Sequence, residues 1–464
     1  MSNDTQRDEL GWRLKPFPEL VRLAWPIAVS MLSYSVMTLV DTLFAGRLGA
    51  TALGAVGFGG VTTFTLLCFG IGLSQGAKVL VSQAVGAGRR DKIPAHVGSA
   101  ITVALCIGAF VGVFGQLVAL GLPLVADGSA SVHLAQRYVS IRVLSAPAIL
   151  TAFAVREIRC ALGDSRSPMR TALIANTLHI PLNAALIFWA GLGVYGAALS
   201  TVIAQTLEAT LLVLIQRWQG GLGLSRWTRR DIEELWQTGW PLGCERLFNV
   251  GSFTLLVTLL ARVGDTGLAA HQIANQLNLF ALLPMFAFAE AAAVLTGQAV
   301  GANEDALIPR VARVAILTSA AYGALCALVY VVFGPTIVGM LTTDPGVRRI
   351  ASHLLLVAAA WQAFDAVYLV SASVLRGAGD VRFATLAMVV IAWVVTPPLA
   401  VLLAVDLGLG AVGGWLALLA EWGTGAVVLF TRLSRRGWQR AAIRSRERLA
   451  ETDPLLLAGP ASSA

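Results

Sequence analysis

The five letters QAVGA occupy residues 83–87 and return at residues 298–302, an offset of 215 (298 − 83). The match extends outward in both directions. GRLG at residues 46–49 corresponds to ARVG at residues 261–264 at the same offset, and CALGDSR at residues 160–166 corresponds to RGAGDVR at residues 376–382 at an offset of 216. A period of this length is far longer than that of a solenoid repeat, so it predicts two copies of one large unit.

The composition places most of the chain in lipid. Of its 464 residues 56% are hydrophobic and 13% are charged, whereas soluble domains carry about 25% charged residues. Twelve apolar runs between Leu20 and Thr431 are each long enough to cross a hydrocarbon core of about 30 Å. We expect an all-α membrane protein with twelve transmembrane helices, six in each homologous bundle. Because six is even, both copies cross in the same sense, which predicts a pseudo-twofold axis along the membrane normal.

Arginine and lysine positions predict the orientation, since positive charge is retained on the cytoplasmic side. Arg89, Arg156, Arg159 and the arginines of the tail fall on the side of the N-terminus. We therefore expect a multi-pass protein of the plasma membrane, the inner membrane in a bacterium, with both termini cytoplasmic. The predicted parts are a cytoplasmic segment 1–19, a first lobe 20–218, a cytoplasmic linker 219–237, a second lobe 238–432 and a basic cytoplasmic tail 433–464. The tail either lies on anionic lipid or is a solvated helix.

Several functional classes are disfavoured. The net charge of +8 is scattered over short loops, unlike the basic face of a nucleic-acid-binding domain. The five cysteines are isolated in or beside apolar segments, which predicts neither disulfides nor a metal site. HExxH, GxSxG and Walker motifs are missing from the sequence, so we expect no enzyme, no cofactor and no use of ATP. An ion gradient would then drive any uphill transport.

Two aspartates stand out because the repeat does not contain them twice. Shifted by 215, Asp41 meets Leu256, and Asp365 shifted back by 216 meets Ile149. A charged side chain within a bilayer costs at least a few kcal/mol, so each acid must face a wet cavity, pair with a cation or take up a proton. We predict that Asp41 and Asp365 couple transport to an ion. Hydrogen bonding to a neighbouring helix is the alternative.

Other polar residues share helical faces within the predicted spans. Glu245 and Asn249 are four residues apart, and Asn176, His179 and Asn183 follow one another at spacings of three and four. The second set favours a polar cavity wall. Glu245 is assigned either to ion coupling or to a local structural role near the cytoplasmic end of its helix.

Four stretches together resemble the MATE (multidrug and toxic compound extrusion) family over nearly the whole chain. They are VDTLFAGRLG at residues 40–49, GLAAHQIANQ at residues 267–276, the repeated QAVGA, and FDAVYLVSASVLRGAGDVR at residues 364–382. The resemblance implies two lobes around a cavity that opens alternately to each side. It also implies antiport, in which organic and often cationic compounds leave in exchange for H⁺ or Na⁺.

Carried onto this sequence, the family's coupling aspartate of the first span falls on Asp41 and its tenth-span acid on Asp365. The family's seventh-span glutamate falls on Asn249, and this chain has Glu245 one turn earlier instead. Trp361 takes the place where sodium-coupled members tend to have tyrosine, and His179 is also unusual for the family. These departures favour H⁺ as the coupling ion at Asp41 and weaken the case for Na⁺ at Asp365.

The resemblance thus predicts a secondary antiporter that exports amphipathic, cationic organic compounds, working in membrane lipid as a monomer. One alternative is a sodium-coupled drug antiporter. Another is a flippase for a lipid-linked or amphipathic metabolite, which would need a basic cavity. We expect few cations inside the spans, chiefly Lys78 and Arg246.

Overall fold

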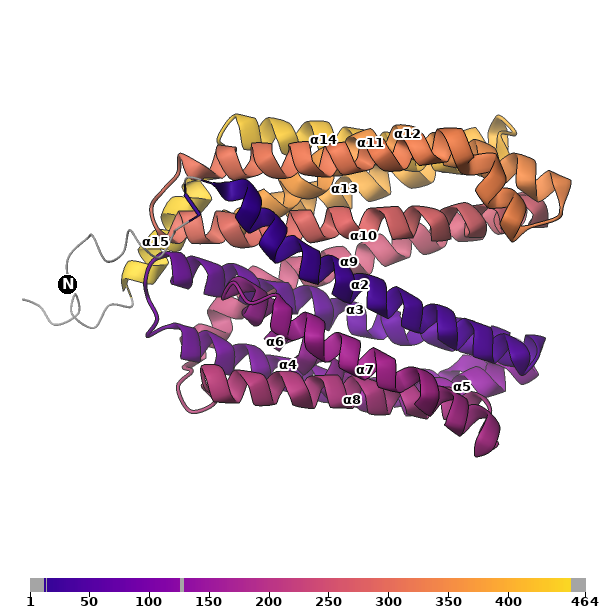
Figure 1. Cartoon of the computed structure of the whole chain (residues 1–464), viewed down its shortest axis with the longest axis horizontal. Coiled ribbons are helices and arrows are strands. Elements are labelled where there is room, and N and C mark those ends of the chain that lie inside the picture. The colour runs from indigo at the N-terminus through magenta and orange to yellow at the C-terminus, as the bar shows by residue number, and fades with distance from the viewer. Residues whose placement is uncertain (1–11, 14, 126–128, 452–464) are drawn as a thin grey trace, which may run out of the picture. The chain divides into compact units, whose positions relative to one another are not determined.

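A computed structural model describes residues 12–13, 15–125 and 129–451, so parts of the predicted segments 1–19 and 433–464 lie outside the described residues. In the described part twelve helices are long and apolar enough to span a membrane (Figure 1). In chain order the spans are α2 (Pro16–Arg47), α3 (Ala50–Gly86), α4 (Ile93–Val125), α5 (Ala130–Arg142) continued by η2 (Val143–Ser145) and α6 (Ala146–Ala161), α7 (Arg166–Ala184) continued by η3 (Ala185–Trp189), α8 (Val194–Gln219), α9 (Arg229–Val263), α10 (Asp265–Gly301), α11 (Leu307–Leu341), α12 (Pro345–Gly377), α13 (Val381–Ala400) continued by η4 (Val401–Asp406), and α14 (Gly410–Ser434). A shorter helix, α15 (Gln439–Glu451), follows them.

The turns between the helices recur with the sequence. Gly163 and Gly379, which are 216 residues apart, both end a span with a left-handed backbone, at φ 84° and φ 87°. Gly88 at φ 68° is matched 215 residues later by Asn303 at φ 59°, and asparagine is among the few other residues that adopt this conformation readily. The local backbone therefore supports two copies of one unit, while the orientation of the axis that relates them stays a prediction.

The QAVGA motif is conserved between the copies for a packing reason. A Cβ atom on Gly86 would lie 1.9 Å from the carbonyl oxygen of Gln298, and one on Gly301 would lie 2.0 Å from that of Gln83. The ends of α3 and α10 therefore cross at glycines, each placed against the other's motif. Any larger residue at these two positions would force the helices apart.

Contacts divide the chain into two compact units. The Asp41 unit consists of residues 26–81 and 90–247, and the Asp365 unit consists of the described residues up to 25, of 82–89 and of those from 248 onward. The helices α2, α3 and α9 each contribute residues to both units. One core cluster of the Asp41 unit includes Ala45, Tyr138 and Ile187. A larger cluster in the Asp365 unit includes Trp361, Trp415 and Tyr330.

Large apolar side chains are exposed along the middle of several spans. Examples on α4 are Phe110, Val113 and Leu117, and examples on α11 are Leu325 and Val332. Contiguous apolar surface of this kind marks contact with lipid or another apolar partner. Together with the twelve apolar helices it identifies a multi-pass membrane protein.

The helix α15 packs within the Asp365 unit through its arginines. Arg446 donates to the carbonyl oxygen of Val300 at 3.0 Å and pairs with Asp305, and Arg448 donates to Gln83 Oε1 at 3.0 Å. Two of the tail's basic residues are thus directed at protein, where the sequence left open only lipid or solvent.

Candidate functional site

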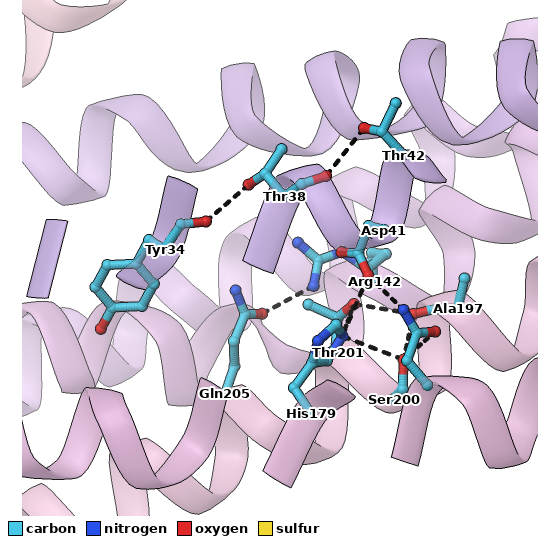
Figure 2. Close-up of polar contacts among 11 residues, drawn as sticks. Tyr34, Thr38, Asp41, Thr42, Arg142, His179, Ala197, Ser200, Thr201 and Gln205 are labelled. Atoms are coloured by element: carbon cyan, nitrogen blue, oxygen red, sulfur yellow. Dashed lines mark hydrogen bonds and ion pairs between the residues drawn. The ribbon is translucent and has the colours of Figure 1, made fainter. Parts of the chain in front are cut away.

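Asp41 lies near the end of α2, where α7 supplies two polar partners. Asn183 Nδ2 donates to Asp41 Oδ1 at 2.6 Å. His179 Nε2 lies 3.3 Å from the same oxygen (Figure 2). His179 and Asn183 are fully buried. The structure therefore brings together three of the residues that the sequence singled out.

The surrounding hydroxyls indicate which nitrogen of His179 carries the proton. Its Nε2 lies 3.3 Å from Ser200 Oγ and 3.4 Å from Thr201 Oγ1. Both hydroxyls donate elsewhere, because each lies 2.9 Å from the carbonyl oxygen of Ala197. Nδ1 is buried without a hydrogen-bond partner among the described residues. This network assigns a neutral imidazole with its hydrogen on Nε2, the nitrogen that lies 3.3 Å from Asp41 Oδ1.

Only one oxygen of the Asp41 carboxyl, Oδ1, contacts the residues of this network. Within the described part of the chain Oδ2 has no hydrogen-bond partner, and 12% of the Asp41 side chain is exposed. A carboxylate with one oxygen held and the other accessible can accept a proton or a cationic ligand without dismantling its own support. This is the feature that makes Asp41 a functional candidate.

The stripe on α7 meets α2 at a second level. Asn176 Nδ2 donates to Ser33 Oγ at 2.7 Å, two turns before the contact between Asn183 and Asp41. Asn176 and Asn183 thus both turn toward α2, while the prediction that Asn176, His179 and Asn183 form the wall of a polar cavity stays a prediction.

Sequence reasoning missed cations inside the fourth span, among them Arg142 and Arg156, so the expectation that Lys78 and Arg246 are the chief ones is wrong. Arg142 ends α5 beside the Asp41 cluster and donates to Gln205 Oε1 at 2.9 Å (Figure 2). Arg156 lies within α6 rather than in a loop, because the helix continues to Ala161. A signal was present, since Arg142 directly precedes the apolar run VLSAPAIL.

Arg156 belongs to a buried network of its own. It pairs with Glu208 of α8 at 2.9 Å and bonds the Tyr34 hydroxyl, and that hydroxyl donates to Glu208. Tyr34 precedes Asp41 by seven residues on α2, so both lie on one face of that helix. This network ties together α2, α6 and α8.

Asp365 has very different surroundings. It is fully buried, and among the described residues neither carboxyl oxygen has a hydrogen-bond partner. Trp361 precedes it by one turn and packs edge-on against Trp422, with ring centroids 5.3 Å apart, while Tyr368 packs on the same Trp422 at 4.6 Å. Such an aromatic setting suits a neutral carboxylic acid better than a bare carboxylate.

The remaining predicted pair, Glu245 and Asn249, lies on α9. Glu245 is buried in the segment of α9 that passes close to α3, where a Cβ on Gly72 would lie 2.4 Å from the Leu242 carbonyl oxygen. Asn249 is half-buried one turn later. Among the described residues no group of three or more His, Cys, Asp or Glu side chains could hold a metal ion.

Comparison with known proteins identifies the family. The family model MatE matches residues 26–185 and 241–402, a part of each repeat. The chain is 29% identical over 444 residues to a probable multidrug resistance protein NorM of Acinetobacter baylyi, covering 93% of this chain and 98% of that one. It is 30% identical to a protein of the same name from Burkholderia pseudomallei, covering 90% and 92%.

A solved structure shares the fold. The outward-facing structure of a multidrug resistance MATE family transporter of the MOP superfamily superposes with a TM-score of 0.85 at 18% identity, covering 91% of this chain and 96% of that one. Members of this family are transporters rather than enzymes. From its two matched segments, its relatives and its twelve spans, the chain belongs to the MatE family of multidrug efflux transporters.

Proposed function

We propose that the chain exports amphipathic, cationic organic compounds in exchange for H⁺, with Asp41 as the coupling carboxylate. The observation that carries the proposal is the Asp41 cluster, in which Asn183 and His179 hold Oδ1 and leave Oδ2 accessible. An ionised Asp41 attracts an organic cation, and a protonated Asp41 does not. Proton and drug then lower each other's affinity, as antiport requires.

The surroundings of the second acid favour H⁺ over Na⁺. Sodium is bound by several oxygen ligands, and Trp361, one turn before Asp365, packs against the rings of Trp415 and Trp422. Asp365 in this setting is a buried acid that stays neutral, and its role is to shape the second lobe. Glu245 has a local role in α9 on this proposal.

The remaining features of the proposal concern the setting of the protein. It works as a monomer in membrane lipid, in the plasma membrane or in the inner membrane of a bacterium, with both termini in the cytoplasm. The lobes 20–218 and 238–432 alternate the access of the drug to either side. No organic or metal cofactor takes part.

The test is efflux of a cationic dye from cells in which the proton and sodium gradients are imposed separately. We expect the proton gradient alone to drive efflux by the natural protein. Asp41→Asn should abolish efflux at an unchanged amount of protein in the membrane, because the carboxyl can no longer exchange a proton. Asp365→Asn and Glu245→Gln should retain most of it.

Two results would contradict the proposal. Full efflux by Asp41→Asn would remove Asp41 from the coupling mechanism. A strict requirement for sodium, with Asp365→Asn or Glu245→Gln as the inactive variant, would move coupling to the other acids and favour the sodium-coupled alternative.

A further inference from the structure

Arg142 holds a positive charge deep in a membrane span. The fourth span begins at Ala130 and runs for 32 residues, and Arg142 lies twelve residues along it, about 18 Å at 1.5 Å per residue. A cation at such depth is costly and usually serves a functional site or an ion pair. The contacts of Arg142 distinguish these two explanations.

An ion pair does not account for it. Its guanidinium donates to the neutral amide of Gln205, and Nε is buried without a hydrogen-bond partner among the described residues. Arg156 provides the contrast within the same span, since it is paired directly with Glu208 at 2.9 Å. Within the described part of the chain Arg142 forms no such pair, so its charge is only partly offset.

The charge is directed at the Asp41 cluster. Arg142 interacts electrostatically with Asp41, His179 and Tyr138, and Figure 2 shows it next to Asp41. The groups that face Asp41 are Tyr138 and Arg142 from α5 and His179 and Asn183 from α7, and Ser200 and Thr201 from α8 lie against His179. With His179 in its neutral form, Asp41 and Arg142 carry the formal charges of this group. Its net charge is zero when Asp41 is ionised and +1 when Asp41 is protonated.

We propose that Arg142 is a release residue, whose fixed positive charge expels a cationic substrate once Asp41 has taken up a proton. This inference rests on the proposed function, in which Asp41 is the site of proton exchange. Without Arg142 the protonated cluster would be neutral, and a lipophilic cation could stay bound to the apolar walls around it. When Arg142 is present, protonation of Asp41 leaves the cationic substrate facing the positive charge of Arg142. Arg142 therefore weakens cation binding in both protonation states and makes the protonated state a releasing one.

The effect on transport follows from this repulsion. Arg142→Gln should bind a cationic dye more tightly by a factor on the order of ten, the size expected for unit charges several ångströms apart at a partly screened site. Because release slows while binding tightens, KM and kcat for efflux should both fall. A merely structural role would lower kcat without lowering KM.

The decisive experiment measures the binding of a permanently cationic dye and of its uncharged isostere to four purified proteins: the natural protein, Asp41→Asn, Arg142→Gln and the double variant. We expect Asp41→Asn to bind the cationic dye poorly, since it mimics the protonated acid beside Arg142. The double variant should bind the cationic dye about tenfold more tightly than Asp41→Asn does. The uncharged isostere should bind all four proteins alike. Arg142→Lys keeps the charge and should match the natural protein.

The outcomes separate this inference from the function on which it rests. If Asp41→Asn binds the cationic dye as well as the natural protein does, the proposed coupling role of Asp41 fails. If Asp41→Asn weakens binding and the second substitution restores none of it, or if Arg142→Lys behaves like Arg142→Gln, the release role of Arg142 fails while Asp41 stands. If Arg142→Gln does not fold, Asp41→Asn alone still tests the role of Arg142. Equal binding of the cationic dye and of its uncharged isostere to Asp41→Asn would overturn that role.

Discussion

Asp164 and Asp380 occupy the same place in the two copies, after the left-handed glycine that ends a span. Each nevertheless pairs with an arginine from a different place in its copy. Asp164 bonds Arg159 of the preceding helix, and Asp380 accepts from Arg432 at 2.9 Å. Partial burial acts to raise the pKa of the Asp164 carboxyl, but hydrogen bonds from Ser167 and Arg159 outweigh it and hold the pKa below its usual 3.8. The ionised form is therefore the one that stabilises the fold.

Asp164→Asn should lower the free energy of unfolding by about 1 kcal/mol at neutral pH, a small value because 26% of the side chain is exposed. A carboxyl whose pKa is lowered in the folded protein stabilises it above the unfolded-state pKa, and this contribution is lost as the pH falls through the folded-state value. The difference between Asp164→Asn and the natural protein should therefore shrink below pH 3.8 in thermal unfolding of the detergent-solubilised protein. Exposed Asp406→Asn is the control, and a deficit that persists in acid would contradict the ion-pair explanation.

Residues differ in how far the sequence could place them. Asp41 and the stripe of His179 and Asn183 were recognisable, because a polar residue in an apolar run is conspicuous and helical spacing fixes its face. Arg142 was overlooked because it follows a polar stretch, and because its significance lies in the contact with Gln205 and the proximity of Asp41, which are brought together only by packing. The lack of a partner for Asp365 was likewise invisible, because a sequence does not show which neighbours a side chain lacks.

At the scale of elements, α15 stabilises the crossing at which the two QAVGA motifs meet. Arg448 bonds Gln83 of the first motif, Arg446 bonds Val300 of the second, and Arg89 donates to the carbonyl oxygen of Leu449 at 2.9 Å. The twelve spans could be predicted from hydropathy alone. The docking of α15 could not, because its basic residues serve equally well on lipid, in water or against protein.

The double variant Arg446→Ala, Arg448→Ala should loosen this helix. Hydrogen bonds to charged groups contribute about 1.5–3 kcal/mol when buried, and the partial exposure of Arg446 reduces this to about 1–2 kcal/mol for the pair. Amide hydrogen exchange in residues 439–451 should therefore become faster than in the natural protein. The matched control is Arg440→Ala, Arg444→Ala, which removes the same charge from exposed positions of the same helix. If amide exchange becomes faster by the same amount in both double variants, the docking of α15 depends on net charge rather than on these contacts.

At the scale of the whole molecule, the repeat and the site follow different rules. Packing features recur, as the matched turns at Gly163 and Gly379 show. The features of the candidate site do not recur, since Asp41 and Arg142 lie in the first copy while Asp365 and the aromatic cluster around Trp361 lie in the second. Duplication thus accounts for the scaffold, and divergence of the copies accounts for the candidate site. Such divergence would leave a single coupling carboxylate, in one of the two copies.

The arrangement of the spans in the membrane yields the last prediction. Ser225, in the linker rich in arginine, and Thr343, between α11 and α12, are both exposed, and the three spans α9, α10 and α11 separate them. An odd number of crossings puts the two positions on opposite sides, and the excess of arginine assigns Ser225 to the cytoplasm. In a variant whose five native cysteines are replaced by alanine, Thr343→Cys should react with an impermeant thiol reagent in intact cells. Ser225→Cys should react only after permeabilisation. Reversed labelling would overturn the orientation, and labelling of both from one side would overturn the number of crossings between them.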